Sequence, residues 1–192
     1  MPHSTDQSQG FTLVETMVAG TLLVSLSLIA TLWLTGVSDL WWTTTTQSDV
    51  RTATQQALSR MLSELRSATR TAAGSPPNAV IPAAPGNTTL TFYLPADVDG
   101  NGLIIDALGN TEWNVATPVQ YAYVPAQRRL VRTQAGQQVV LATDVTAVAF
   151  EDASLNPALY QNEVKITLTL QRVTPQRRTV SATAAEIVKL RN

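Results

Sequence analysis

The sequence predicts an α+β protein in which a long N-terminal helix packs on a C-terminal antiparallel β-sheet domain. Three observations lead to this fold class. An apolar run over residues 11–37 is long enough to cross a bilayer as a helix. Residues 38–75 continue the helix pattern with one apolar face. Residues 76–192 alternate short β-branched runs with turn residues, which is typical of antiparallel strands.

The apolar run, FTLVETMVAGTLLVSLSLIATLWLTGV, contains one charged residue, Glu15. About 20 apolar residues span the hydrocarbon core of a bilayer, so the run predicts a transmembrane helix. The polar segment before it, residues 1–10, is predicted to be a short cytoplasmic leader. Aromatic side chains that favour the membrane–water boundary lie towards the far end of the run: Trp33, Trp41 and Trp42.

Residues 38–75 are predicted to extend this helix as an amphipathic segment. No proline interrupts them, and apolar residues recur at steps of three and four. Thr43–Thr46 is the weakest part, because β-branched side chains lose freedom in a helix. Gly74 and the two prolines after Ser75 end the pattern. The predicted apolar stripe consists of Val50, Ala53, Ala57, Leu58, Met61, Leu62 and Leu65.

Residues 76–192 are predicted to form a β-rich extracytoplasmic domain. Residues 125–128 and 134–136 carry turn signals of hairpins. Residues 164–170 alternate apolar and polar side chains, so one face of that strand should be buried. The apolar stripe of the preceding helix is the expected cover for these strands. The predicted strands are 88–94, 119–124, 129–133, 139–142, 145–150, 164–171 and 179–188.

Composition argues against catalysis and against nucleic acid as a partner. The formal net charge is −1, which gives no basic surface for a polyanion. The chain has no cysteine, which excludes thiolate nucleophiles and Cys-based zinc sites. Its one histidine is His3, so a histidine triad or general base is not expected beyond the first residues. Arg128–Arg129 and Arg177–Arg178 are predicted to be solvated strand ends or turns.

The most specific motif is Gly10-Phe11-Thr12-Leu13-Val14-Glu15 at the head of the apolar run. A charge inside a membrane segment is costly, which points to a function for Glu15. The motif resembles the class III signal of type IV prepilins and pseudopilins. The resemblance implies that a membrane prepilin peptidase cuts between Gly10 and Phe11, and that the new N-terminus is then methylated. A pilin-like fold is also implied.

Glu15 has a physical role in this interpretation. Cleavage creates a positive α-amine on Phe11, and Glu15 lies one helical turn further along. Pairing of these two charges, within a chain or between neighbours, would favour correct registration during assembly. The resemblance implies a single-pass protein of the inner membrane that later enters an extracellular or periplasmic filament, with other pilins or minor pseudopilins as partners.

Further segments resemble particular members of this family. DVRTATQQALSRMLSELRSATR, and VQYAYVPAQRRLVR followed by VVLATDVTAVAFED, are similar to PilW-like minor pilins and J-type minor pseudopilins of type II secretion. This resemblance implies a subunit of the tip or priming complex. An unprocessed single-pass anchor that carries a binding module is the alternative, and processing at Gly10 separates the two. A secretory signal peptide is disfavoured because no basic residue precedes Arg51.

The segment from Asp97 to Asp106 has oxygen ligands at alternate positions and a turn glycine. This spacing matches the start of an EF-hand-type calcium loop. The bidentate glutamate expected at the twelfth position is replaced by Leu108. A calcium site and a polar turn between strands therefore both remain open, and no other cofactor is expected. The candidate ligands are Asp97, Asp99, Asn101, Leu103 (by its carbonyl) and Asp106.

Overall fold

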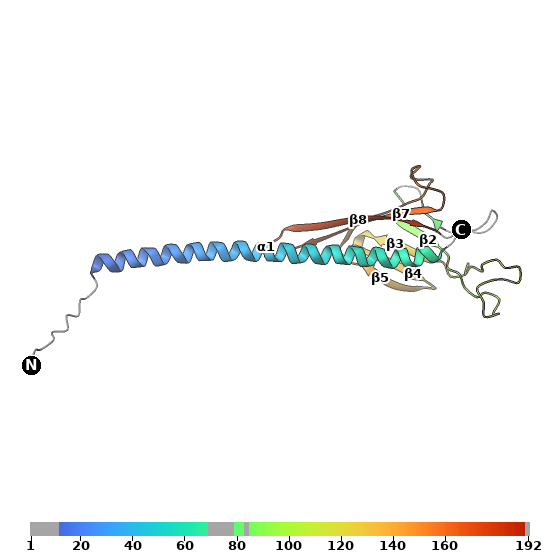
Figure 1. Cartoon of the computed structure of the whole chain (residues 1–192), viewed down its shortest axis with the longest axis horizontal. Helices are drawn as coiled ribbons and strands as arrows, with labels where there is room; N and C mark the ends of the chain where they lie inside the picture. Colours follow the sequence, from blue (N-terminus) through green and yellow to red (C-terminus); the bar gives the residue numbers. More distant parts are fainter. Residues whose placement is uncertain (1–11, 69–78, 83–84, 191–192) are drawn as a thin grey trace, which may run out of the picture. The chain divides into compact units, whose positions relative to one another are not determined.

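Figure 1 shows the computed structural model of the chain, which describes residues 12–68, 79–82 and 85–190. The chain forms two compact units, residues 1–43 and 44–192. One helix, α1 (Leu13–Ser67), contributes to both. The predicted leader lies outside the described residues. The other elements belong to the second unit: β1 (Ala79–Val80), β2 (Thr89–Phe92), β3 (Val119–Val124), η1 (Pro125–Gln127), β4 (Arg129–Gln134), β5 (Gln137–Ala142), β6 (Val145–Glu151), β7 (Glu163–Val173) and β8 (Thr179–Lys189).

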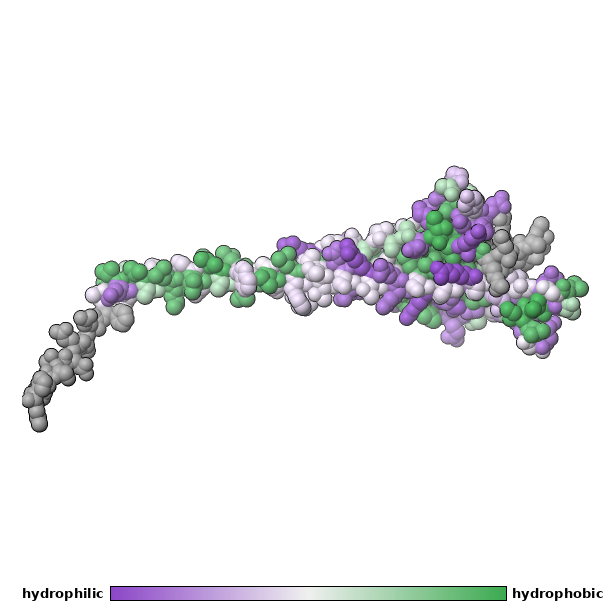
Figure 2. All heavy atoms as spheres, viewed as in Figure 1, coloured by the Kyte–Doolittle hydropathy of each residue, from purple (hydrophilic) through white to green (hydrophobic). Residues whose placement is uncertain are grey.

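The first unit holds the apolar part of α1. This stretch is long and apolar enough to span a membrane, and its apolar side chains are exposed, as the green surface in Figure 2 shows. The hydroxyl groups of this stretch are used in hydrogen bonds within the helix. Each one from Thr16 to Thr35 donates to a backbone carbonyl three or four residues earlier, at 2.8–2.9 Å. The backbone therefore satisfies the polar groups that hydrocarbon would leave unpaired.

The second half of α1 packs against the strands, as the apolar stripe predicts. Five of its seven predicted stripe residues are buried, and the other two, Ala53 and Leu62, are partly buried against the same core. Thr54 is also buried, and its hydroxyl donates to the carbonyl oxygen of Val50 at 2.7 Å. The helix continues through Thr43–Thr46, where sequence propensity is weakest, and Thr46 is buried. Tertiary packing thus outweighs the local preference.

The strands form two antiparallel sheets. One has five strands in the order β1-β2-β3-β4-β5, and the other has three in the order β6-β7-β8. The predicted α+β fold class is therefore confirmed, with one long helix packed on antiparallel sheets. In β7 every second residue from Val164 to Leu170 is buried, so the predicted alternation is also confirmed. The two-residue strand β1 was not predicted, since two residues give no period to detect.

The connection between β4 and β5 is a two-residue turn at Ala135 and Gly136. Both residues have positive φ, 50° and 77°. A type I′ hairpin turn requires positive φ at both central positions, which glycine adopts freely and alanine does not. The turn sets the register in which Gln134 faces Gln137. The hairpin predicted at residues 134–136 is therefore confirmed, with some backbone strain at Ala135.

A long excursion joins β2 to β3. Its two arms are held together by isolated bridges, Pro95 with Trp113 and Ile105 with Thr111. The backbone N–H of Glu112 also donates to the carbonyl of Ile104 at 2.9 Å. We call residues 95–113 the tip loop; Figure 1 shows it beyond the end of β2. It carries exposed apolar side chains: Val98, Leu103, Ile104, Ile105 and Leu108.

Candidate functional site

Three groups of side chains are candidates for function, and the first lies at the start of α1. Gly10 and Phe11, the predicted processing site, lie outside the described residues. Within the described residues, Thr12 and Glu15 hydrogen-bond to each other in both directions. Glu15 Oε2 accepts hydrogen bonds from the backbone N–H and the hydroxyl of Thr12, both at 2.9 Å. The backbone N–H of Glu15 donates to Thr12 Oγ1 at 3.3 Å.

This arrangement is a capping box, which the sequence interpretation of Glu15 did not include. Thr12 precedes the first helical residue and Glu15 is the third residue of the helix. The carboxylate is thereby folded back towards the N-terminal end of α1. That is the side on which a cut before Phe11 would place an α-amine. The positive end of the helix dipole also favours a carboxylate there.

The second group lies in the tip loop. Asp97 accepts three backbone N–H groups, from Gly100 and Gly102 at 2.8 Å and from Asn101 at 3.1 Å. These bonds, that of Gly102 first, hold the pKa of Asp97 below its ordinary value. Asp99 accepts from the backbone and side-chain N–H groups of Asn101, at 3.0 and 2.8 Å.

Glu112 completes an acidic cluster with Asp97 and Asp99. One ligand oxygen from each of these three residues lies within 4.8 Å of the others. Glu112 comes from the returning arm of the tip loop, and its Oε2 accepts the backbone N–H of Val98 at 2.6 Å. Glu112 was not among the predicted ligands because an EF-hand calcium loop ends at its twelfth position, here Leu108. The signal available in the sequence was a second acid beyond the turn.

The other predicted ligands are placed differently. Asp106 forms a second turn, in which its carboxylate accepts the backbone N–H groups of Leu108 and Asn110, both at 2.8 Å. The side chain of Asn110 is the main cause of the lowered pKa of Asp106. Asn101 Oδ1 accepts from the backbone N–H of Leu103 at 2.7 Å.

The three carboxylates of the acidic cluster, Asp97, Asp99 and Glu112, are a ligand set that suits Ca²⁺, which prefers hard oxygen donors.

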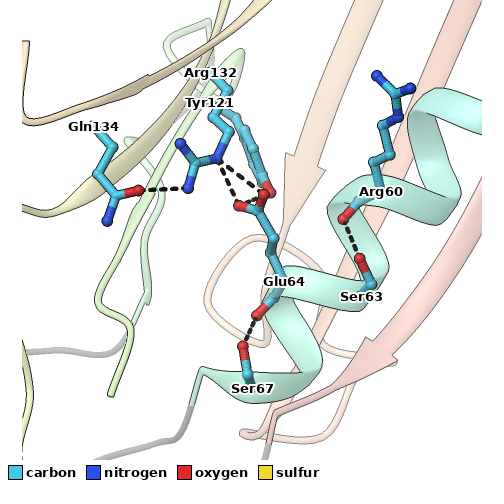
Figure 3. Close-up of polar contacts among 7 residues, drawn as sticks. All are labelled: Arg60, Ser63, Glu64, Ser67, Tyr121, Arg132 and Gln134. Atoms are coloured by element: carbon cyan, nitrogen blue, oxygen red, sulfur yellow. Dashed lines mark hydrogen bonds and ion pairs between the residues drawn. The ribbon is translucent and has the colours of Figure 1, made fainter. Parts of the chain in front are cut away.

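The third group fastens α1 to the five-stranded sheet, and Figure 3 shows it. Arg132 Nε donates to both oxygens of Glu64, at 3.0 and 2.8 Å. The Tyr121 hydroxyl donates to Glu64 Oε2 at 2.9 Å, and Arg132 Nη2 donates to Gln134 Oε1 at 2.6 Å. We call Glu64, Tyr121 and Arg132 the helix clamp.

Burial makes the helix clamp stronger than a surface ion pair. The side chains of Arg132 and Glu64 are 18% and 30% exposed. Tyr121 is a core residue whose ring lies 5.2 Å from that of Phe92. Burial, and then the charge of Glu64, raise the pKa of Tyr121 far above its ordinary value. Sequence patterning placed Glu64 outside the apolar stripe but gave it no partner.

The clamp residues of the sheet come from the segment VQYAYVPAQRRLVR, which contains Tyr121 and Arg132. They lie opposite each other in the β3–β4 ladder, and both reach the same carboxylate of α1. This geometry has a structural purpose, because it fixes the helix on the sheet. Comparisons with family models, with curated proteins and with solved structures gave no match for this chain.

Proposed function

We propose that this chain is a minor pilin or pseudopilin, a structural subunit of a type IV pilus-like or type II secretion filament. The observation that carries the proposal is the motif from Gly10 to Glu15 at the head of a membrane-length apolar stretch of α1. The function is assembly, with no catalytic step by this chain. The tip or priming complex is the proposed position, with homologous minor subunits as partners.

The proposed sequence of events starts in the membrane. The apolar stretch of α1 holds the precursor in the inner membrane, with the second unit on the extracytoplasmic side. A prepilin peptidase cuts between Gly10 and Phe11, and the new N-terminus is methylated. The apolar stretch then moves from lipid into the core of a filament. Both surroundings keep its exposed apolar side chains away from water, which lowers the cost of the transfer.

Glu15 acts at the moment of assembly. In the uncut chain its carboxylate accepts from Thr12. Cleavage adds a positive α-amine one residue before Thr12, so the same carboxylate gains an oppositely charged neighbour. A charge that is expensive in hydrocarbon becomes tolerable when it is paired. Glu15→Gln keeps a hydrogen-bond acceptor for Thr12 but removes the charge.

Intact mass and N-terminal sequencing of protein from native membranes or sheared filaments test the proposal. We expect a chain that begins at Phe11 and carries one added methyl group. A chain that begins at Met1 would refute the prepilin assignment. Glu15→Gln should be cut normally but enter filaments poorly. Thr12→Ser, which retains the hydroxyl of the capping box, is the matched control and should assemble as the parent does.

The acidic cluster of the tip loop favours a second candidate function, calcium-dependent binding by an unprocessed, membrane-anchored module. Asp97, Asp99 and Glu112 would supply oxygen ligands, and the ion would offset the repulsion among three carboxylates. The two candidates differ at Gly10, because only the prepilin is cut. Calcium binding by a processed subunit would be compatible with the first proposal, so N-terminal sequencing decides between them.

A further inference from the structure

A concentration of arginines marks one end of the second unit, where the β3–β4 connection contacts the last part of β7. Arg128 Nη2 donates to the carbonyl oxygen of Gln171 at 2.7 Å and so joins the β3–β4 connection to β7. Arg172 Nε pairs with Asp144 Oδ2 at 3.0 Å. Five arginines lie at this end, and Arg178 among them has a further interaction of its own. We call them the basic end: Arg128, Arg129, Arg172, Arg177 and Arg178.

Contacts with α1 show which end of the unit this is. Arg132, in the second half of β4, binds Glu64, near the end of the helix. Leu130 pairs with Ala142, and Ala142 lines a groove together with Ala57 of α1. Residues earlier in β4 therefore lie beside residues earlier in α1. The basic end lies towards the start of the second unit.

The β7–β8 hairpin carries the basic end further in the same direction. Arg128 contacts β7 at Gln171, and the strand continues for two residues to Val173 before it turns. Two residues of strand add about 7 Å. The chain arrives at this end from the apolar stretch of α1. Only six residues, 38–43, lie between Val37 and Thr44 in the sequence.

The surface of the basic end combines cations with an exposed apolar side chain. The apolar side chain of Val173, the last residue of β7, is 56% exposed. Arg129 and Arg177 are exposed. In the part of α1 that belongs to the second unit, the exposed Asp49 and Arg51 carry opposite charges. Cations beside exposed apolar groups are the composition of protein surfaces that bind at the membrane interface.

The opposite charge gathers elsewhere in the unit. No lysine or arginine occurs from residue 71 to residue 127, a stretch that contains four acidic residues. All four belong to the tip loop: Asp97, Asp99, Asp106 and Glu112. An anionic surface would attract the basic end and repel the tip loop, so the charge distribution favours one orientation of the unit.

We propose that the basic end docks on anionic phospholipid headgroups of the bilayer that holds α1. The inference rests on the membrane anchoring proposed above. Arginine guanidinium groups suit phosphate because they donate two parallel hydrogen bonds. The short connection to the membrane segment keeps the effective concentration of headgroups high, so a weak site is occupied. Docking would hold the second unit at the membrane surface until α1 leaves the bilayer during assembly.

The test uses the full chain in lipid nanodiscs, either of phosphatidylcholine alone or with a minority of phosphatidylglycerol. The chain has no cysteine, so Val173→Cys gives a single site for an environment-sensitive fluorophore. Leu108→Cys, in the tip loop, is the matched control position. We expect blue-shifted emission from the label at residue 173 only in anionic discs, reversed by high salt. The label at residue 108 should not respond.

Charge removal gives the quantitative readout. Arg129→Gln with Arg177→Gln should lower the ratio of docked to free units roughly thirtyfold, since each arginine near an anionic surface contributes about fivefold. Arg60→Gln with Arg66→Gln removes the same charge from exposed positions of α1 and should leave docking unchanged. Circular dichroism and thermal unfolding of both variants confirm that they are folded.

Three results would overturn the inference. An equal response in neutral and anionic discs would show that lipid charge is not recognised. A response that requires two chains in one disc and ignores lipid charge would assign the basic end to another copy of the protein. Failure of the chain to enter nanodiscs would refute the membrane anchor itself. Since insertion is measured separately, either of the first two results refutes only the docking of the basic end.

Discussion

Replacement of Glu64 by glutamine should destabilise the second unit by roughly 2–3 kcal/mol. The glutamine cannot pair with the charge of Arg132, whose side chain is only 18% exposed. Hydrogen bonds to charged groups contribute about 1.5–3 kcal/mol each, and exposed ion pairs about 0.2–1 kcal/mol. The partial burial of the helix clamp places the loss in the upper half of this range. Glutamine can still accept from Tyr121, so part of the network survives.

Urea and thermal unfolding of the full chain in detergent micelles, followed by circular dichroism, measure the loss. For a unit of this size, 2–3 kcal/mol corresponds to a fall in Tm of roughly 4–12 °C. Asp49→Asn is the matched control, since it removes an exposed carboxylate from the same helix and should change Tm little. A double-mutant cycle of Glu64→Gln with Arg132→Gln isolates the pair, and we expect a coupling free energy of about 1–2 kcal/mol. A coupling near zero would refute the clamp.

Three further predictions follow from the structure. The raised pKa of Tyr121 stabilises the fold fully below the unfolded-state pKa of about 10, and this stability is lost as pH rises above it; Tyr121→Phe should therefore flatten the fall of Tm with pH at alkaline pH. Ala135→Asn should raise stability by about 0.5–1 kcal/mol because asparagine tolerates the φ of 50°, whereas Gly136→Ala should lower it by about 1 kcal/mol; an unchanged Tm for both would contradict the assigned turn. If the tip loop binds calcium, saturating Ca²⁺ should raise Tm by about 5–10 °C over chelator, and Glu112→Gln should remove most of this rise.

Most of the fold was predictable because its elements carry strong periodic signals. The alternation in β7 and the apolar stripe of α1 both depend on burial of one face, and burial is what the pattern records. Strand bounds were predicted within a few residues, since turn residues separate the strands. The helix as described ends at Ser67, and residues 69–75 of the predicted amphipathic segment lie outside the described residues.

The candidate sites were less predictable, because they depend on contacts between distant residues. Glu64 lies 68 residues from Arg132 in the sequence, and no spacing rule connects a helix position to a strand position. Glu112 joins Asp97 only because the tip loop folds back on itself. The capping box at Thr12 and Glu15 was within reach of the sequence, since it is a local motif. The charge of Glu15 in an apolar segment predicts a role in the membrane, and the capping role exists beside it.

The bonded hydroxyl groups of the apolar stretch have a consequence for reversibility. Each hydroxyl from Thr16 to Thr35 is already donated to the backbone of its own helix. Exchange of lipid neighbours for helical neighbours therefore requires no hydrogen bond to be broken or made along this stretch. Only packing differs between the two surroundings, and packing differences are small per contact. If the chain is the filament subunit proposed above, such a helix can return to the bilayer and be used again.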